Sequence, residues 1–210
     1  MTYSHIREQV YETVIKIQDA GLTRLSAGNV SARTEDGLVA ITPSAVKYDV
    51  LTPRDIAIVD LQGNPVDAAR PPSSETPMHT AILRHFPDVN AVCHTHSPHA
   101  ITFSMAVEEV PAANIELLMC GAPIPVGRWV CPGTQGGAEV AVELFSQHPG
   151  LKVFLLRQHG LVAVGANLGQ AFEFAFDAEV GMQAYYYALN VGKPLPLTPQ
   201  QIAEVQRRYA

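Results

Sequence analysis

Apolar residues follow helical spacing in some segments of the chain and form short strand-like runs in others. From Ser4 to Ala20 they recur every three or four positions, which predicts an amphipathic helix, capped by Ser4 and ending at Gly21. Short apolar runs bounded by Gly, Pro, Asn and Asp predict strands. The strands are expected near 29–33, at 38–42, 56–61, 91–95, 153–156 and 161–164, and further helices at 74–86, 97–105, 134–147, 168–189 and 198–209. This alternation of helices and strands predicts an α/β fold.

Two segments give weaker patterns. Between Pro111 and Val126 the chain is apolar, but Gly121, Pro123 and Pro125 interrupt it, so only short extended pieces are expected there. The segment from Asp67 to Pro72 is expected to be a loop. Tyrosines at 185–187 on the long helix are expected to pack in the core or against another subunit.

The size and charge of the chain narrow its class. Its 210 residues suit one domain, taken as 1–210, and a 16% share of charged residues is ordinary for a globular protein. The formal net charge is −6 and Lys and Arg form no cluster, which argues against nucleic-acid and membrane partners. Three widely spaced cysteines fit reduced thiols, and no signal-peptide or membrane-spanning run is found. A cytoplasmic location is therefore expected.

Three histidines are candidates for binding a metal. His94 and His96 are two apart on a predicted strand, so their side chains point to the same face, roughly 6.5–7 Å apart along the backbone. Alone, such a pair is more often a polar strand edge. His159, before Gly160 at a tight bend between two apolar strands, is a reasonable third ligand. Three histidines with an open fourth position describe a catalytic zinc-type site rather than a structural one.

Other polar residues are expected at helix starts and turns. Ser73 and Ser74 open a predicted helix, where free backbone amides make a natural phosphate site, and Glu75 lies in the same turn. An ordinary helix cap explains these three residues equally well. Gly28-Asn29 and the turn Thr42-Pro43-Ser44-Ala45 could also contact an anion, although each reads first as a simple turn.

Together these groups have a clear chemical use. A metal polarises a carbonyl or hydroxyl oxygen and stabilises the enediolate that remains when an adjacent bond breaks. A nearby carboxylate moves the proton. The serines and turns would hold a phosphate beside the cation.

The order of these motifs resembles the class II aldolase/adducin family. The resemblance covers almost the whole chain, and five motifs in the right order are more specific than any one alone. They are Gly28-Asn29, Thr42-Pro43-Ser44, Ser73-Ser74-Glu75, His94-Thr95-His96 and His159-Gly160. The resemblance implies an α/β domain with a mostly antiparallel central sheet flanked by helices on both faces. It also implies a homotetramer with active sites between adjacent subunits.

The resemblance further implies a role for each residue. His94, His96 and His159 would bind one Zn²⁺ per subunit, and Glu75 would be the acid/base and a further metal ligand when no substrate is present. The residues implied to contact the substrate phosphate are Gly28, Asn29, Ser44, Ala45, Ser73 and Ser74. The implied reaction is the reversible retro-aldol cleavage of a ketose 1-phosphate to dihydroxyacetone phosphate and an aldehyde.

The chain departs from the family pattern at two places. Ala45 stands where the phosphate turn of the aldolases usually has glycine. In the aldolases a tyrosine reaches into the neighbouring subunit's site and protonates the aldehyde side. This chain has no tyrosine at that position, which falls near Ile115, beside Glu116. Tyr209 matches the position of an aromatic tail residue that closes over the site in relatives.

Other members of the same family remain alternatives. Pentulose-5-phosphate 4-epimerases use the same retro-aldol step but carry aspartate where this chain has Glu75, which favours the aldolase. Sugar-phosphate dehydratases and decarboxylases stay open because the tyrosine is missing. A metal-free interaction domain, as in adducin, is the alternative of another class, and the retained histidines and Glu75 argue against it.

Overall fold

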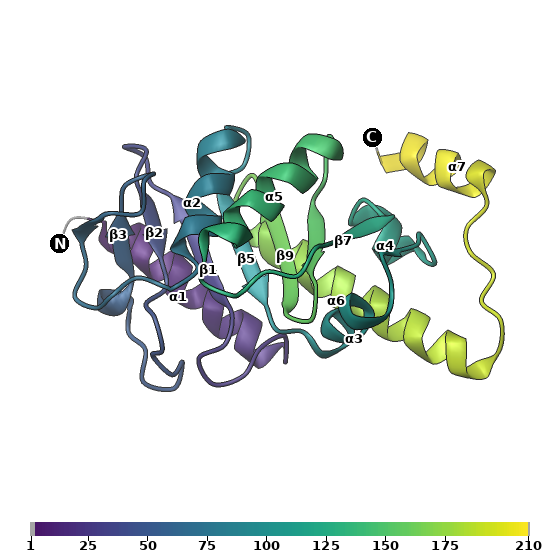
Figure 1. Cartoon of the computed structure of the whole chain (residues 1–210), viewed down its shortest axis with the longest axis horizontal. Coiled ribbons are helices and arrows are strands. Elements are labelled where there is room, and N and C mark those ends of the chain that lie inside the picture. The colour runs from purple at the N-terminus through teal and green to yellow at the C-terminus, as the bar shows by residue number, and fades with distance from the viewer. Residues whose placement is uncertain (1–2, 210) are drawn as a thin grey trace.

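One large sheet runs through the middle of the molecule in the computed structural model, which describes residues 3–209 (Figure 1). Within that range nine strands are ordered β4-β3-β2-β1-β5-β9-β8-β7-β6, and all neighbours are antiparallel except the parallel pair β7 and β8. The strands are β1 (Asn29–Arg33), β2 (Val39–Ile41), β3 (Ala57–Val59), β4 (Pro65–Asp67), β5 (Ala91–Thr95), β6 (Glu109–Val110), β7 (Ile124–Gly127), β8 (Val153–Leu156) and β9 (Gly160–Gly165). The predicted mostly antiparallel sheet is confirmed.

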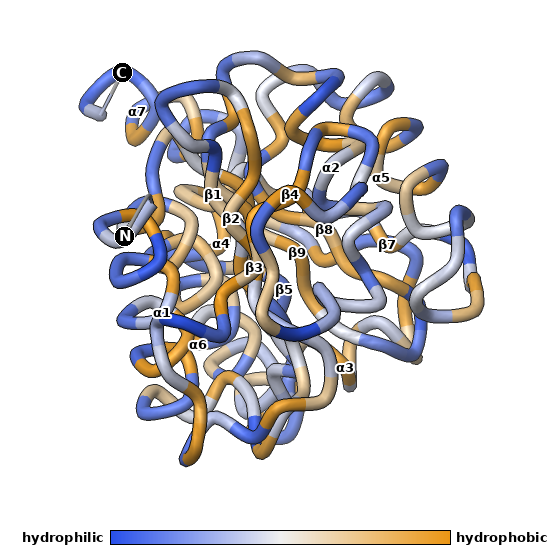
Figure 2. The backbone as a smooth tube through the Cα atoms, turned by 90° about the vertical axis from the view of Figure 1, so that its left-hand side faces the viewer, coloured by the Kyte–Doolittle hydropathy of each residue, from blue (hydrophilic) through white to orange (hydrophobic). Residues whose placement is uncertain are grey.

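Helices cover both faces of this sheet, as predicted. In Figure 2, α1 and α6 lie on one side of the strands and α2 and α5 on the other. The helices are α1 (Ser4–Asp19), α2 (Thr76–His85), α3 (Pro98–Ala106), α4 (Ile115–Met119), α5 (Gln135–Gln147), α6 (Leu168–Val191) and α7 (Pro199–Tyr209). A 3₁₀ turn, η1, lies at Pro53–Asp55. Helix α1 begins after Tyr3, so Ser4 is its first residue rather than its cap.

The alternation of side chains along the strands creates two apolar cores. On β5, Ala91 and Cys93 pack in the core under α1 and α6, whereas Val92 packs in the core under α2 and α5. Successive side chains of a strand point to opposite faces. His94 and His96 therefore lie on the same face as Val92, toward α2.

Two weakly patterned segments contain elements that the sequence did not predict. Between Pro111 and Val126 the chain forms the short helix α4 before β7, so the expectation of extended pieces alone was wrong there. The cause is Asn114, whose side chain accepts a hydrogen bond from the Leu117 amide and caps the helix. Strand β4 begins before the predicted loop and extends the sheet at its edge.

The C-terminal segment leaves the body of the molecule. An extended linker after α6 turns back and carries α7 to the side of α4 (Figure 1), and none of the residues of α7 is buried. Of the three tyrosines on α6, Tyr185 stacks on Phe103 with ring centroids 5.4 Å apart. Tyr186 and Tyr187 are exposed. The packing predicted for these tyrosines thus holds within the chain only for Tyr185.

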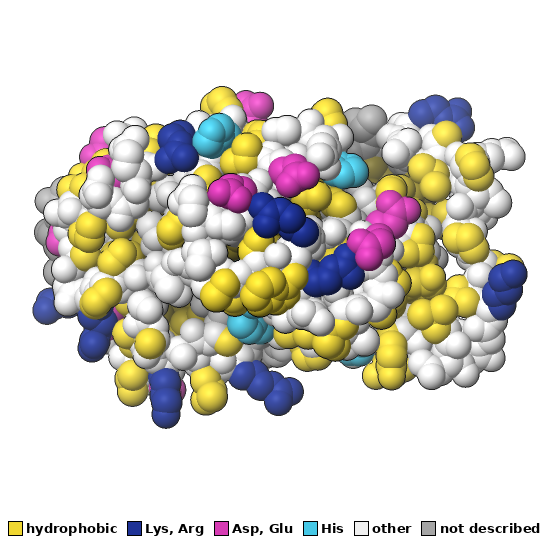
Figure 3. Space-filling view, viewed as in Figure 1, with side chains coloured by type: hydrophobic (Ala, Val, Ile, Leu, Met, Phe, Trp, Pro, Cys, Tyr) yellow, Lys and Arg dark blue, Asp and Glu magenta, His cyan; other side chains and the backbone are white. Residues whose placement is uncertain are grey.

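The surface agrees with the charge pattern of the sequence. On the face drawn in Figure 3, Lys and Arg side chains lie singly or beside Asp and Glu rather than in a basic patch. Arg128 pairs with Glu139 and Arg157 with Glu108. Within residues 3–209, no helix combines the length and the apolar character that crossing a membrane requires.

Candidate metal and phosphate site

Three histidines meet at one end of the sheet. His94 is on β5, His96 follows that strand, and His159 precedes β9, which pairs with β5 so that His94 lies opposite Val162. The ring centroids of the three histidines are 4.7–5.0 Å apart. One ligating nitrogen of each lies within 4.8 Å of the others. These spacings allow the three imidazoles to hold one ion, although their role as metal ligands stays a prediction.

The bend at His159 depends on a close approach between backbones. A Cβ atom added to Gly160 would lie 2.3 Å from the Thr95 carbonyl oxygen and 3.1 Å from the His94 ring. Only glycine fits this position, because real Cβ atoms do not come so close to a backbone oxygen. Gly160 therefore lets β9 pack against β5 tightly enough to bring His159 to the other two histidines.

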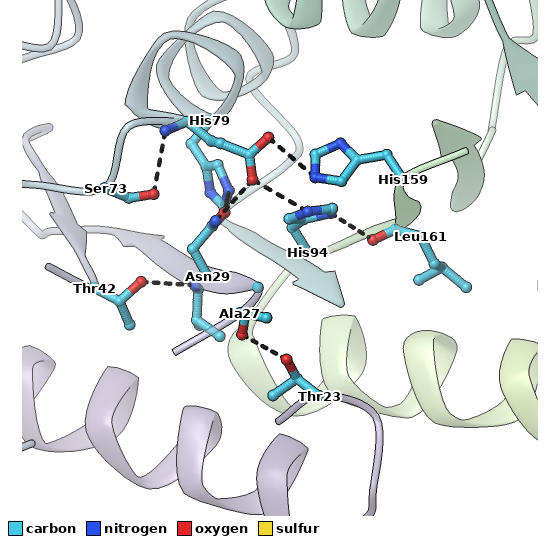
Figure 4. Close-up of polar contacts among 12 residues, drawn as sticks. Thr23, Ala27, Asn29, Thr42, Ser73, His79, His94, His159 and Leu161 are labelled. Atoms are coloured by element: carbon cyan, nitrogen blue, oxygen red, sulfur yellow. Dashed lines mark hydrogen bonds and ion pairs between the residues drawn. The ribbon is translucent and has the colours of Figure 1, made fainter. Parts of the chain in front are cut away.

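The hydrogen bonds of His94 leave one ring nitrogen for a ligand. Its Nδ1 donates to the Leu161 carbonyl oxygen over 2.9 Å (Figure 4), so its Nε2 carries the lone pair in the neutral ring. This Nε2 is buried and has no hydrogen-bond partner among residues 3–209. Glu75 Oε2 is only 3.1 Å away, but it lies off the direction that a ring N–H would take. A buried, unpartnered imidazole nitrogen beside two further imidazoles and a carboxylate fits a divalent cation such as zinc.

Glu75 joins the histidines from helix α2. It is the N-cap residue of that helix, and its oxygens lie 3.1 Å from His94 Nε2 and 3.9 Å from His159 Nε2. Asn29 Nδ2 donates to Glu75 Oε2 over 2.9 Å. Burial alone would raise the pKa of Glu75, but His94 and the Asn29 amide outweigh it and hold the pKa well below its usual range. Glu75 is therefore a carboxylate, the form that can accept a proton.

The three histidines differ in their affinity for protons. Burial lowers the pKa of His96 to about 3 and that of His159 to about 4, and the neighbouring His94 adds to both shifts. Burial also disfavours a charged His94, but the Glu75 carboxylate outweighs it and raises the pKa of His94 above its ordinary value. Of the three histidines, His94 therefore keeps a second ring proton to the highest pH.

Metal affinity should depend on pH through this one proton. Since the pKa of His94 is raised, a metal must displace its proton at any pH below that pKa, whereas His96 and His159 are already neutral. We expect zinc affinity to fall about tenfold for each pH unit below the His94 pKa. Calorimetric zinc titrations between about pH 5 and about pH 8 measure this slope. If the logarithm of the zinc affinity rises by nearly three for each pH unit, each ion displaces three protons. That result would contradict the different pKa values of the three histidines.

The residues predicted to contact phosphate line one pocket beside the histidines. The pocket has a volume of about 210 Å³. Its lining includes Gly28, Asn29, Ser44, Ala45, Ser73, Ser74, Glu75, His96 and His159, and also Ser26, Ala27, Pro43 and Pro132. The structure thus brings every predicted site residue to this pocket or to its wall, with the fully buried His94 behind the lining.

Two backbone conformations shape the pocket. Gly28 has a φ of +74°, and a Cβ added to it would lie 2.6 Å from the His94 carbonyl oxygen. Ala45 also has a positive φ, of 56°. The glycine usual at this position in the aldolases adopts such a φ without strain, whereas alanine pays a steric cost of roughly 1–2 kcal/mol. Although alanine replaces the usual glycine at position 45, the turn keeps the backbone conformation that glycine favours.

Sequence reasoning missed the residues that support the pocket from behind. His79, which is fully buried, contacts Asn29, and Ser31 contacts His79. The Tyr48 hydroxyl lies 2.9 Å from the Ala27 carbonyl and 2.8 Å from that of Gly28, so it fixes the loop before β1. One signal was present for His79, since it follows Glu75 by four residues on a helix and so lies on the same face.

Three further residues, His99, Ile115 and Tyr209, lie away from the pocket. His99 on α3 contacts Glu179 on α6 through Nδ1 over 2.8 Å, so it joins these two helices and is not part of the three-histidine cluster. Ile115, which falls at the position of the missing tyrosine, lies on α4 in a groove shared with Tyr209 of α7. Neither Ile115 nor Tyr209 is among the described residues that line the phosphate pocket of this chain.

Comparison with known proteins identifies the class to which this fold and site belong. Residues 8–186 match the family described as the Class II Aldolase and Adducin N-terminal domain. The chain belongs to the class II aldolase and adducin family. Its relatives are aldolases, which makes it a lyase of this family, and the metal dependence of class II aldolases agrees with the cluster of three histidines.

Particular relatives match along nearly their whole length. The 5-deoxy-D-ribulose 1-phosphate aldolase of Bacillus thuringiensis serovar kurstaki is 33% identical, over 97% of this chain and 94% of that protein. The L-fuculose phosphate aldolase of Escherichia coli K12 is also 33% identical, over 100% of this chain and 96% of that protein. A solved L-fuculose 1-phosphate aldolase superposes with a TM-score of 0.90 at 28% identity, covering 100% of this chain and 98% of that one.

Proposed function

We propose that this protein is a Zn²⁺-dependent aldolase that cleaves a ketose 1-phosphate, similar to L-fuculose 1-phosphate, into dihydroxyacetone phosphate and an aldehyde. The observation that carries the proposal is the cluster of three imidazoles and the Glu75 carboxylate at the wall of one pocket of about 210 Å³. The proposal takes the whole of residues 1–210 as one catalytic domain.

His94, His96 and His159 would hold one zinc ion per subunit, with Glu75 as a further ligand when no substrate is bound. When bound, the ion supplies Lewis-acid polarisation of the substrate's carbonyl and hydroxyl oxygens. Backbone contacts favour this donor set, because the Leu161 carbonyl keeps His94 in the tautomer whose Nε2 can bind a metal.

The opposite wall of the pocket would hold the phosphate. The Ser73 and Ser74 side chains lie beside the N-terminus of α2, where free amides and the helix dipole favour an anion. Ser44 and the backbone of Gly28 and Ala45 line the same pocket and add further donors. With the phosphate fixed there, the adjacent carbons of the sugar point toward the histidines.

Glu75 would then carry the proton at the reacting carbon. Cleavage would break the bond between C3 and C4, leave its electron pair on C3 as an enediolate, and pass the proton of the C4 hydroxyl to an acid/base group that a neighbouring subunit would supply. The carboxyl group of Glu75 returns a proton to C3 to complete dihydroxyacetone phosphate, and in the reverse direction it takes that proton away. Because its pKa is low in the free site, Glu75 is a carboxylate there, which is the form that the second role requires.

Two relatives narrow the substrate class but not the aldehyde. One is named for 5-deoxy-D-ribulose 1-phosphate and the other for L-fuculose phosphate, which differ in the part of the sugar that becomes the aldehyde. A 4-epimerase, dehydratase or decarboxylase remains the alternative, because a neighbour at 25% identity carries the description "putative aldolase/epimerase/decarboxylase". Glu75, in place of aspartate, favours the aldolase.

We further propose a cytoplasmic homotetramer whose active sites lie between subunits. Several large apolar side chains of the C-terminal region are exposed in the single chain: Tyr187, Leu189, Val191, Leu195 and Tyr209. Ile202 and Val205 of α7 lie three residues apart on one helix face, and no residue of that helix is buried. An apolar surface of this kind favours contact with another subunit. The residue that protonates the aldehyde would come from such a neighbour.

The proposal is tested by supplying candidate substrates to the zinc-loaded protein. L-fuculose 1-phosphate and 5-deoxyribulose 1-phosphate are expected to release dihydroxyacetone phosphate, which a coupled reductase assay detects. Pentulose 5-phosphates serve as the control, and formation of an epimer or a dehydrated product from them would assign the alternative. No turnover of any of these sugars with zinc present would defeat the lyase assignment.

A further inference from the structure

A row of three buried polar side chains, those of Asn29, His79 and Ser31, runs away from the pocket behind Glu75. Asn29 Nδ2 donates to Glu75 Oε2 over 2.9 Å, His79 Nε2 lies 2.5 Å from Asn29 Oδ1, and His79 Nδ1 lies 2.7 Å from Ser31 Oγ. Asn29 and Ser31 come from β1, whereas Glu75 and His79 come from α2. Figure 4 shows His79 beside Asn29, on the side away from His94 and His159.

The charge on Glu75 sets the direction of every hydrogen bond in this row. A carboxylate only accepts, so the amide nitrogen of Asn29 must face it, and Oδ1 of Asn29 must face His79. His79 must then carry its proton on Nε2 and present the lone pair of Nδ1 to the Ser31 hydroxyl, which donates. The reversed amide would place Oδ1 of Asn29 against the carboxylate, where two acceptors repel.

His79 is suited to one fixed protonation state. Its side chain is fully buried, and burial lowers its pKa to about 3, so the ring is neutral. The tautomer follows from its two partners, Asn29 and Ser31, which leave no polar atom of the ring unpaired. A neutral, fixed imidazole can orient a neighbour but exchanges no proton with the substrate.

We propose that His79 is a positioning residue, which holds the Asn29 amide so that its nitrogen faces Glu75 and the pocket. Without the His79 donor, Oδ1 of Asn29 would be buried with no partner, and the amide would turn toward the pocket and release Glu75. The expected effect on catalysis rests on the proposed roles of Glu75 and Asn29. The orientation of the Asn29 amide is independent of the proposed function.

Two substitutions separate positioning from packing. His79→Gln can place an amide N–H near the position of Nε2 and so keep the donor to Asn29, whereas His79→Leu fills similar space without a donor. We expect His79→Leu to lower kcat/KM about 10–100-fold, mainly through kcat, and His79→Gln to restore most of it. Ile82→Ala is the control, because Ile82 is a fully buried residue of the same helix outside the row, and its loss should lower Tm but not kcat/KM.

A readout that needs no substrate tests the orientation itself. ¹⁵N NMR of the imidazole rings is expected to show His79 protonated on Nε2 alone in the wild-type protein, from about pH 5 to about pH 9. The side-chain amide signals of Asn29 should shift in His79→Leu and return in His79→Gln.

Three results would overturn the proposal. They are a proton on Nδ1 of His79 in the wild-type protein, unchanged Asn29 signals in His79→Leu, and equal losses of kcat/KM in the Gln and Leu variants at similar Tm. The first needs no variant, so it decides the matter even if His79→Leu fails to fold. A wild-type protein that cleaves no ketose phosphate but shows the predicted tautomer would refute the proposed function and leave the positioning role intact.

Discussion

His96→Ala is expected to lose bound zinc while the protein stays folded. His96 contributes one of the three imidazoles and lies at the pocket, so its removal opens the cluster without leaving a cavity in either apolar core. Zinc sites bind with roughly 10–16 kcal/mol, so one of four ligands accounts for roughly 2.5–4 kcal/mol, or about 10²–10³-fold in affinity. Metal analysis after dialysis against a weak chelator, with a zinc titration, measures the loss.

A matched control comes from the same protein. His85 is an exposed histidine at the end of α2 whose ring lies against the Ala81 carbonyl and Phe86, away from the pocket, so His85→Ala should keep the zinc content of the wild type. The thermal midpoints of metal-free His96→Ala and metal-free wild-type protein should agree within a few degrees. If His96→Ala retains full zinc affinity, the three histidines do not form the metal site.

One face of the sheet explains why these groups meet. On β1 and β5 the side chains of Asn29 and Ser31 and of His94 point toward α2, and Asn29 pairs directly with His94 across the two strands. Helix α2 begins at the same end of the sheet and brings Glu75 to the cluster. Polar side chains therefore replace apolar ones on this face along β1 and at the end of β5, so the site lies directly beside the apolar core under α2 and α5.

Sequence patterns predicted the parts of the site that depend on local spacing. The two-residue separation of His94 and His96 on a strand already placed them on one face, and the serines before Pro77 already marked a helix start. His159 lies more than sixty residues away, and only the pairing of β9 with β5 brings it to the others. No local pattern contains that pairing, so the third ligand was expected from the family resemblance and from the bend at Gly160.

Other features were missed for physical reasons that differ. A histidine on the buried face of a helix reads as an ordinary core residue, and the partner that gives His79 its role, Asn29, is fifty residues away in the chain. The helix α4 was missed because Gly121, Pro123 and Pro125 dominated the pattern, although Asn114 is a good N-cap residue. Each miss reflects a long-range contact or a local signal masked by stronger neighbours.

Glu75→Gln is expected to keep the metal but lose most of the activity. Glutamine has nearly the same shape as glutamate and its Oε1 can still accept from Asn29, so the pocket and the three histidines should stay in place. What disappears is the group that takes and returns the proton at C3. General acid–base catalysis contributes about 10²–10⁴-fold, so kcat should fall by that factor with little change in KM.

The same substitution tests the assignment of the proton in the metal-free site. Glu75 raises the pKa of His94, and with a neutral amide in its place the pKa of His94 should fall, because burial then acts almost alone. Zinc binding to Glu75→Gln should therefore depend less steeply on pH than binding to the wild type.

A second carboxylate, Glu179, is also buried but binds His99 at a distance from the pocket, so Glu179→Gln should keep the wild-type kcat. Full activity of zinc-loaded Glu75→Gln would remove Glu75 from the proton transfer and direct the search for the base to the other subunits of the proposed tetramer.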